Sequence, residues 1–336
     1  MRDSEPARLW YRIVAETVWG RRGIVKTSSL YLPLALVLST PCTPLGKDIC
    51  LRSLQVFVAV ACWCLASILS NDVADRQADR AAGKERWVWG LPAGAGALVV
   101  AALWAAGISS LLPAGTTAAL AAYVAALVLG LSYSLGPVRF KSRGIYGPLV
   151  YGASGTLAFA VTPWAFLGSS WSTLTVIVPA VLLDKWVNIH FHQVIDCASD
   201  QGSGIRTYAV DVGLERARRS LKWAAAVASG WLVGTLAFIA ARLPPWGIVV
   251  AGAGLATVLA AGAYAGVIRR QPERASPLLK ELSWPYLGLT FAVFRVAPIL
   301  LLARLAAHNP TLWALFAVAV LSLAVESYHA SRYERI

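Results

Sequence analysis

The chain has 336 residues, of which 57% are hydrophobic and only 14% are charged. A soluble domain carries about 25% charged residues, so the composition excludes an ordinary soluble protein. The formal net charge of +13 would indicate a nucleic-acid partner in a soluble protein. Here most basic residues fall in the connections on one side of the apolar runs, which is the positive-inside rule of membrane proteins, and no nucleic-acid partner is predicted.

Apolar runs recur along the whole chain and predict an all-α, polytopic membrane bundle of nine to ten transmembrane helices. The bilayer core offers backbone groups no water, so the spans must be helices. The ten candidate spans are about 28–44, 51–71, 90–112, 117–134, 146–167, 172–195, 219–241, 246–268, 284–306 and 311–328. The first and last are short or broken, so nine spans are also possible.

This organisation predicts three parts. Residues 1–27 are expected to form a cytoplasmic amphipathic arm, residues 28–328 the transmembrane domain, and residues 329–336 a cytoplasmic tail. The positive-inside rule places both termini and both acidic clusters described below on the cytoplasmic face. We expect an integral, multi-pass protein of a bacterial plasma membrane.

The first acidic cluster, NDVADRQAD, follows the second span. Asn71, Asp75 and Asp79 are four residues apart, so they lie along one face of a helix, with Asp72 beside them. Hard oxygen ligands at this density suit Mg²⁺, which usually binds through one or two carboxylates together with substrate phosphates. The alternative is a solvated helix end with ordinary surface acids.

The second cluster, DCASD, closes the sixth span and repeats this spacing in Asp196 and Asp200. The stripe continues back into the membrane through His192, Asn188 and Asp184.

Ionisable residues within a span are costly and are functional candidates by default. Asp184 and its neighbour Lys185 are therefore candidates for polar groups of the cavity, although a structural polar patch facing other helices explains them equally well.

Basic and hydroxyl groups occur where a diphosphate would need them. They are Arg80, Lys84 and Arg86 after the first cluster, Tyr133, Arg139 and Lys141 in YSLGPVRFK, and Arg206 after the second cluster. Two carboxylate sets joined through metal to one diphosphate, with Lys and Arg on the remaining oxygens, would stabilise a leaving group as its charge develops. Each basic residue taken alone is more typical of a lipid-headgroup contact.

In this order and spacing, the motifs resemble those of the UbiA superfamily of intramembrane prenyltransferases. Its NxxxDxxxD motif matches Asn71, Asp75 and Asp79. Its second motif is similar to DCASDQGSGIRTYAVDVG, and its YxxxP…K element is similar to Tyr133, Pro137 and Lys141. The resemblance implies about nine spans around a cavity that opens to lipid, and Mg²⁺-dependent ionisation of a prenyl diphosphate.

Pattern and resemblance together predict four sets of site residues. The catalytic set is Asp75, Asp196, Asn71 and Tyr133; the Mg²⁺ ligands are Asp72, Asp75, Asp79, Asp196 and Asp200; the diphosphate contacts are Arg80, Lys84, Arg139, Lys141 and Arg206; the cavity polar groups are Asp184, Lys185, Asn188 and His192. The predicted partners are a prenyl diphosphate, an unidentified lipophilic acceptor and membrane lipid.

Two other functions compete with prenyl transfer. A terpene cyclase of the same superfamily would quench the cation with the double bonds of its own chain, and the 14 tryptophans slightly favour this reading. A transporter would bind ions or substrate at the intramembrane polar residues, but transport sites lie near the midplane, whereas the acids here concentrate at one face.

Overall fold

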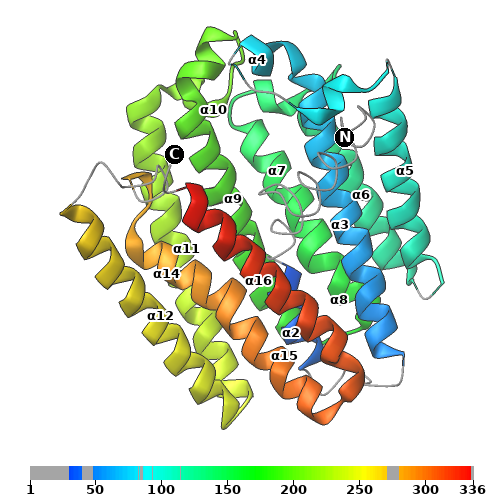
Figure 1. Cartoon of the computed structure of the whole chain (residues 1–336), viewed down its shortest axis with the longest axis vertical. Coiled ribbons are helices and arrows are strands. Elements are labelled where there is room, and N and C mark those ends of the chain that lie inside the picture. Colours follow the sequence, from blue (N-terminus) through cyan, green and yellow to red (C-terminus); the bar gives the residue numbers. More distant parts are fainter. Residues whose placement is uncertain are drawn as a thin grey trace, which may run out of the picture.

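The computed structural model describes residues 30–39, 48–81, 83, 86–92, 94–113, 115–270 and 280–333. In these ranges the chain is all-helical and holds no strand; a single isolated bridge joins Gly144 to Thr207. The long helices pack side by side as a bundle, and the short helices α4 (Arg76–Ala81) and α10 (Tyr208–Val212) lie together at one end of it (Figure 1). The predicted arm, residues 1–27, and Lys84 lie outside the described residues.

Seven helical segments are long and apolar enough to cross a membrane. They are α3 (Ile49–Ala74), α6 (Thr117–Ser134), α7 to α8 (Tyr146–Leu167), α9 (Trp171–Gly202), α11 (Leu214–Arg242), α12 (Trp246–Arg269) and α14 to α15 (Trp284–His308). Two further apolar helices accompany them, α5 (Ala95–Leu111) and α16 (Trp313–Tyr333). The chain is an integral, multi-pass membrane protein, and the nine segments correspond to the second to tenth predicted spans.

The first predicted span, 28–44, differs from expectation. Its described part forms α2 (Tyr31–Leu38), an eight-residue helix in which every side chain is buried. Eight residues rise about 12 Å, less than half of the ~30 Å hydrocarbon core. The helix packs inside the bundle against α8 and α15, and the Tyr31 hydroxyl lies 2.6 Å from that of Ser322 in α16. The described part of this run therefore packs in the core, where hydrophobicity alone looks the same as in a span.

The outer surface of the bundle is apolar. Large side chains such as Leu98, Trp223, Ile248 and Leu259 are exposed on α5, α11 and α12. In water such a surface would be a liability, whereas lipid solvates it. At the C-terminal end, α16 runs on to Tyr333, so the helix passes through the predicted boundary at residue 328.

Two of the crossing segments contain a wide turn. The π-helical turns are η4 (Leu157–Val161), between α7 and α8, and η6 (Ala292–Val296), between α14 and α15. A proline follows each, Pro163 and Pro298. Proline lacks a backbone donor and crowds the preceding turn, so a π-helical turn is a physically reasonable way to accommodate it.

The position of α9 at the centre of the bundle decides where the polar residues meet. α9 packs against α7 on one side and α11 on the other, while α3 packs against α5 and α6. The C-terminal ends of α3, α6 and α9 reach the same end of the bundle, beside α4 and α10 (Figure 1). The two acidic clusters lie at the ends of α3 and α9.

Candidate active site

The two acidic clusters face a common pocket. Its volume is about 100 Å³, and it is lined by Asn71, Asp75, Asp79, Arg86, Lys141, Asp196, Ser199, Asp200, Ser203 and Ile205. The first four come from the end of α3 and the segment after it, Lys141 from the turn between α6 and α7, and the others from the end of α9 and the following loop. The ends of the second and sixth predicted spans therefore meet at one pocket.

The first cluster keeps its four-residue stripe although the helix does not continue through it. α3 ends at Ala74, Asp75 has non-helical angles (φ −95°, ψ 12°), and α4 begins at Arg76. The helical hydrogen bonds persist, because the Asp75 amide donates to the Asn71 carbonyl at 2.9 Å and the Asp79 amide to the Asp75 carbonyl at 2.8 Å. All three side chains therefore still face the pocket.

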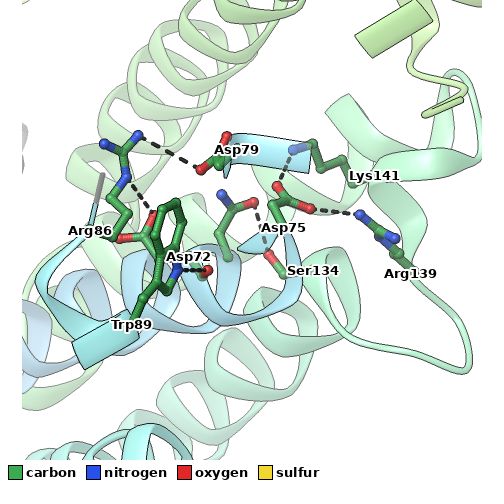
Figure 2. Close-up of polar contacts among 9 residues, drawn as sticks. Asp72, Asp75, Asp79, Arg86, Trp89, Ser134, Arg139 and Lys141 are labelled. Atoms are coloured by element: carbon green, nitrogen blue, oxygen red, sulfur yellow. Dashed lines mark hydrogen bonds and ion pairs between the residues drawn. The ribbon is translucent and has the colours of Figure 1, made fainter. Parts of the chain in front are cut away.

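Asp75 is the central anion of the pocket. Its side chain is only 3% exposed, and two cations hold it: Arg139 Nη2 lies 2.6 Å from Oδ1, and Lys141 Nζ pairs with Oδ2 (Figure 2). Both basic residues come from the turn around η3 (Phe140–Ser142), where Arg139 has a left-handed backbone (φ 37°). This turn carries cations from the α6–α7 connection to an acid of α3.

Arg86 lines the pocket, whereas Arg80, which was predicted to contact the diphosphate, does not. Its guanidinium lies 3.5 Å from Asp72 and 3.8 Å from Asp79 (Figure 2). The segment is turned back onto α3 by Trp89, whose indole N–H donates to the Asp72 carbonyl at 2.8 Å. Asp72 is buried and does not line the pocket; its carboxylate instead holds Arg86 from behind.

Two predicted diphosphate contacts point elsewhere. Arg80 is exposed, with its guanidinium 5.5 Å from the ring centre of Trp89. Arg206 is 77% exposed and pairs with Asp211 at 2.9 Å. Neither residue lines the pocket. Arg80 lies against the Trp89 ring, and Arg206 pairs with Asp211.

The second cluster lies where α9 ends and the chain turns. Asp196, Ser199 and Asp200 line the pocket from the last turns of α9. Gly204 has a positive φ of 70°, a conformation that favours glycine, and the Ile205 amide then donates to the Asp200 carbonyl at 2.8 Å. The chain thereby folds back so that the loop covers the acids.

Tyr133 lies beneath the pocket. It is buried, and its ring centre lies 5.6 Å from that of Tyr151. The neighbouring Ser134 hydroxyl reaches Asn71 Oδ1 at 3.5 Å (Figure 2). Both residues end α6, so this helix supports the pocket from the membrane side.

The predicted cavity polar groups lie deeper and do not line this pocket. Asp184 and Lys185 form an ion pair at 3.2 Å, and the Lys185 ammonium also lies 4.3 Å from the ring centre of Phe159. Asn188 is exposed and His192 is partly buried. Asp184 precedes Asp196 by twelve residues, which is about 18 Å along a helix. The ion pair therefore lies deeper in the bundle than the acids of the pocket.

The acids of the pocket do not form a ready-made metal cage. Among the residues whose placement is described, no three His, Cys, Asp or Glu side chains converge on one point. Mg²⁺ is commonly held by one or two carboxylates plus substrate phosphates. The pocket therefore fits an Mg²⁺ ion that arrives with a phosphate group, with carboxylates contributed from both clusters.

Comparison with known proteins gives one family and one fold. The model of the UbiA prenyltransferase family matches residues 51–284. No curated protein matches the sequence significantly.

Three solved structures share the architecture. A UbiA homologue from Archaeoglobus fulgidus bound to GPP and Mg²⁺ is 19% identical, with a TM-score of 0.60 over 89% of this chain and 96% of that chain. The same homologue bound to DMAPP and Mg²⁺ is 20% identical, with a TM-score of 0.59 over 90% and 96%. A UbiA homologue from Aeropyrum pernix K1 without ligand is 20% identical, with a TM-score of 0.52 over 84% and 98%. At these identities the likeness concerns the fold.

Proposed function

The chain belongs to the UbiA prenyltransferase family, and on that premise we propose that it ionises a prenyl diphosphate with Mg²⁺ and transfers the prenyl group to a lipophilic acceptor within the membrane. The observation that carries the proposal is the pocket, where two acidic clusters and two basic side chains face one small cavity at the end of an apolar bundle. A ligand with a charged head and an apolar tail fits such a boundary. The Archaeoglobus homologue, which binds GPP or DMAPP together with Mg²⁺, supports this pair of ligands.

Each cluster has a role in this proposal. Lys141 and Arg86 bind diphosphate oxygens from opposite sides, while Asn71 orients the acids. The metal ligands that line the pocket are Asp75, Asp79, Asp196 and Asp200. When bound, Mg²⁺ would neutralise the negative charge that develops on the leaving diphosphate.

In the proposed reaction, the negative diphosphate stays in the polar pocket and the prenyl cation stays in the apolar bundle. The bond between C1 of the prenyl group and its oxygen breaks, and the electron pair leaves with the diphosphate, which Lys141 and Arg86 retain in the pocket. The allylic cation remains on the apolar side, where an electron-rich acceptor carbon or oxygen forms the new bond and then loses a proton. A dry site strengthens every one of these electrostatic interactions.

We further propose that the pocket faces the cytoplasm. The basic side chains Arg76, Arg139, Arg143 and Arg216 gather in segments at the same end of the bundle as the pocket, as the positive-inside rule requires of the cytoplasmic side.

A product screen tests transfer. The purified protein is incubated with Mg²⁺ and diphosphates of increasing prenyl length, with and without candidate acceptors, and the products are identified by mass spectrometry. Transfer is supported by a prenylated acceptor that forms only when both substrates are present. A cyclic hydrocarbon or terpene alcohol formed without acceptor would identify a cyclase instead, and substrate flux into vesicles without pyrophosphate release would identify a transporter.

Arg86 lines the pocket and Arg80 does not, so substituting each arginine tests the role of Arg86 in binding pyrophosphate. Arg86→Met is expected to lower the affinity for Mg²⁺-pyrophosphate by about tenfold or more, since a hydrogen bond to a charged group contributes about 1.5–3 kcal/mol. Arg80→Met removes the same charge from the same segment but outside the pocket, and is expected to change the affinity less than twofold. Calorimetric titration of both variants measures the difference. Equal losses would show that only the overall positive charge of the segment matters.

A further inference from the structure

A loop that lines the pocket is anchored at its far end by side chains inside the bundle. The loop follows α9, and its residues Ser203 and Ile205 line the pocket. It continues into α10, which packs against α9 and α11. There the Tyr208 hydroxyl donates a hydrogen bond to the Ser220 hydroxyl at 3.3 Å, and Ser220 Oγ lies 2.7 Å from His190 Nε2. Helices α9, α10 and α11 each contribute one of these three side chains.

The three side chains give each other polar partners in apolar surroundings. His190 is only 2% exposed, and its ring meets that of Tyr208 edge to face, with the ring centres 4.8 Å apart. A buried polar side chain costs free energy unless it is hydrogen-bonded. Moving Tyr208 out of this position removes a hydrogen bond from Ser220 and a ring contact from His190, so the tyrosine has a preferred place between α9 and α11.

This anchor lies on a different side of α9 from the pocket. His190 precedes Asp196 by six residues, which is about 9 Å along the helix and about 240° around it. The histidine therefore faces away from the acids and towards α11, where Ser220 contacts it. It follows that the chain between the acids and the tyrosine crosses the end of α9, and that the anchor can act on a ligand only through the loop.

The other attachments of the loop lie at the surface end of the bundle. Near the pocket, the Ile205 amide donates to the Asp200 carbonyl at 2.8 Å, and further along the Gly144 amide donates to the Arg206 carbonyl at 3.3 Å. Arg206 also pairs with Asp211, but its side chain is 77% exposed, and exposed ion pairs contribute little to stability. The tyrosine side chain is therefore the attachment that reaches into the bundle.

We propose that Tyr208 is a positioning residue that keeps Ser203 and Ile205 over a diphosphate bound in the pocket, with Ser220 and His190 as its partners. This inference rests on the proposed function and assigns the loop a role in binding the diphosphate. Tyr208 itself touches neither the substrate nor the metal ion. When the anchor is weakened, the loop spends less time over the pocket, and the apparent affinity for the ligand falls in proportion to the closed fraction.

Two substitutions of Tyr208 test this role. Tyr208→Phe keeps the ring against His190 and loses the hydroxyl, whereas Tyr208→Leu loses both contacts. The dissociation constant of Mg²⁺-pyrophosphate, measured by calorimetric titration, is expected to rise about threefold in the first variant and about tenfold in the second. Hydrogen exchange of the peptide that carries the Ile205 amide, measured by mass spectrometry, is expected to become faster in the same order.

Ser220→Ala removes the same hydrogen bond from its other side. It is expected to weaken Mg²⁺-pyrophosphate binding at least as much as Tyr208→Phe does. The double variant should bind no more weakly than Ser220→Ala alone, because one hydrogen bond can be lost only once. Additive losses would contradict the inference, since the two residues would then act independently.

Tyr123→Phe is the matched control. Tyr123 of α6 is fully buried, and its hydroxyl donates to the Ala59 carbonyl of α3 at 2.7 Å. The control therefore also loses one tyrosine hydrogen bond between helices, but it leaves the loop untouched. Its melting temperature is expected to fall at least as far as that of Tyr208→Phe, whereas pyrophosphate binding and exchange of the loop peptide should change less than twofold. A merely structural role of Tyr208 would make the two variants alike.

The remaining outcomes separate this role from the proposed function. Unchanged pyrophosphate binding in the folded Tyr208 variants refutes the role of the anchor alone. Weaker binding without faster exchange of the loop peptide also refutes it, because the loop would then not carry the effect. A wild-type protein that does not bind Mg²⁺-pyrophosphate refutes the proposed function, and with it the role of Tyr208.

Discussion

Asp75→Asn and Asp196→Asn are each expected to lower Mg²⁺-dependent pyrophosphate release by at least about a hundredfold. Each exchange keeps the shape of the side chain and removes one negative charge from the pocket, so fewer charged oxygens remain to bridge an ion to the diphosphate. Asp75 has a second function, because its carboxylate pairs with Lys141, which lines the pocket, and with Arg139, which does not. We expect its loss to have the larger effect.

Folding must be preserved for this result to be meaningful. Arg139 and Lys141 are partly exposed, so water can solvate them when Asp75 becomes neutral, and both variants should insert and elute from gel filtration as the wild type does. Asp211→Asn is the matched control, since Asp211 pairs with Arg206 outside the pocket. Normal turnover in both pocket variants would remove the metal assignment.

Removal of Mg²⁺ is expected to abolish turnover without lowering the melting temperature of the ligand-free protein. The reason is that Asp75 is paired with Arg139 and Lys141, while Asp72 and Asp79 share Arg86, so these acids have protein partners without an ion. Thermal unfolding in detergent after chelation, followed by readdition of Mg²⁺, measures both effects.

Mg²⁺ and pyrophosphate together should stabilise the fold when neither does so alone. A ligand that binds only the folded state adds about 2.7 kcal/mol at a hundredfold excess over its Kd, and here the ion and the phosphate complete each other's coordination. Asp196→Asn should lose this joint stabilisation, while Asp211→Asn should keep it. A melting temperature that falls on chelation alone would instead indicate a resident metal ion.

The intramembrane ion pair illustrates why a polar residue in a span is ambiguous. Asp184 and Lys185 were predicted as groups of the cavity, yet they contact each other, and Lys185 also contacts Phe159 of the π-helical turn. Gly155 leaves room for the lysine stem, because a methyl group there would lie 2.9 Å from Lys185 Cγ. The local packing supports a structural role for the pair, which was the alternative reading of the sequence.

Arg86 and Arg206 show where sequence reasoning stops. Arg206 follows the second cluster closely, but Asp211, five residues later, holds it at the surface. Arg86 is seven residues beyond Asp79, and it lies at the pocket where Trp89, three residues later, anchors the chain to the end of α3. Both outcomes depend on partners whose positions follow from the packing of the loops.

The sequence by itself determined the membrane class, nearly all of the helices and the two acidic stripes. These features are local: lipid requires every backbone group to be paired within a helix, and residues four apart share a face of that helix. The tertiary structure decided that the described part of the first apolar run packs in the core as α2, and that Arg86 reaches the pocket while Arg80 and Arg206 do not. Those outcomes depend on which faces of distant helices meet, and neither spacing nor composition contains that information.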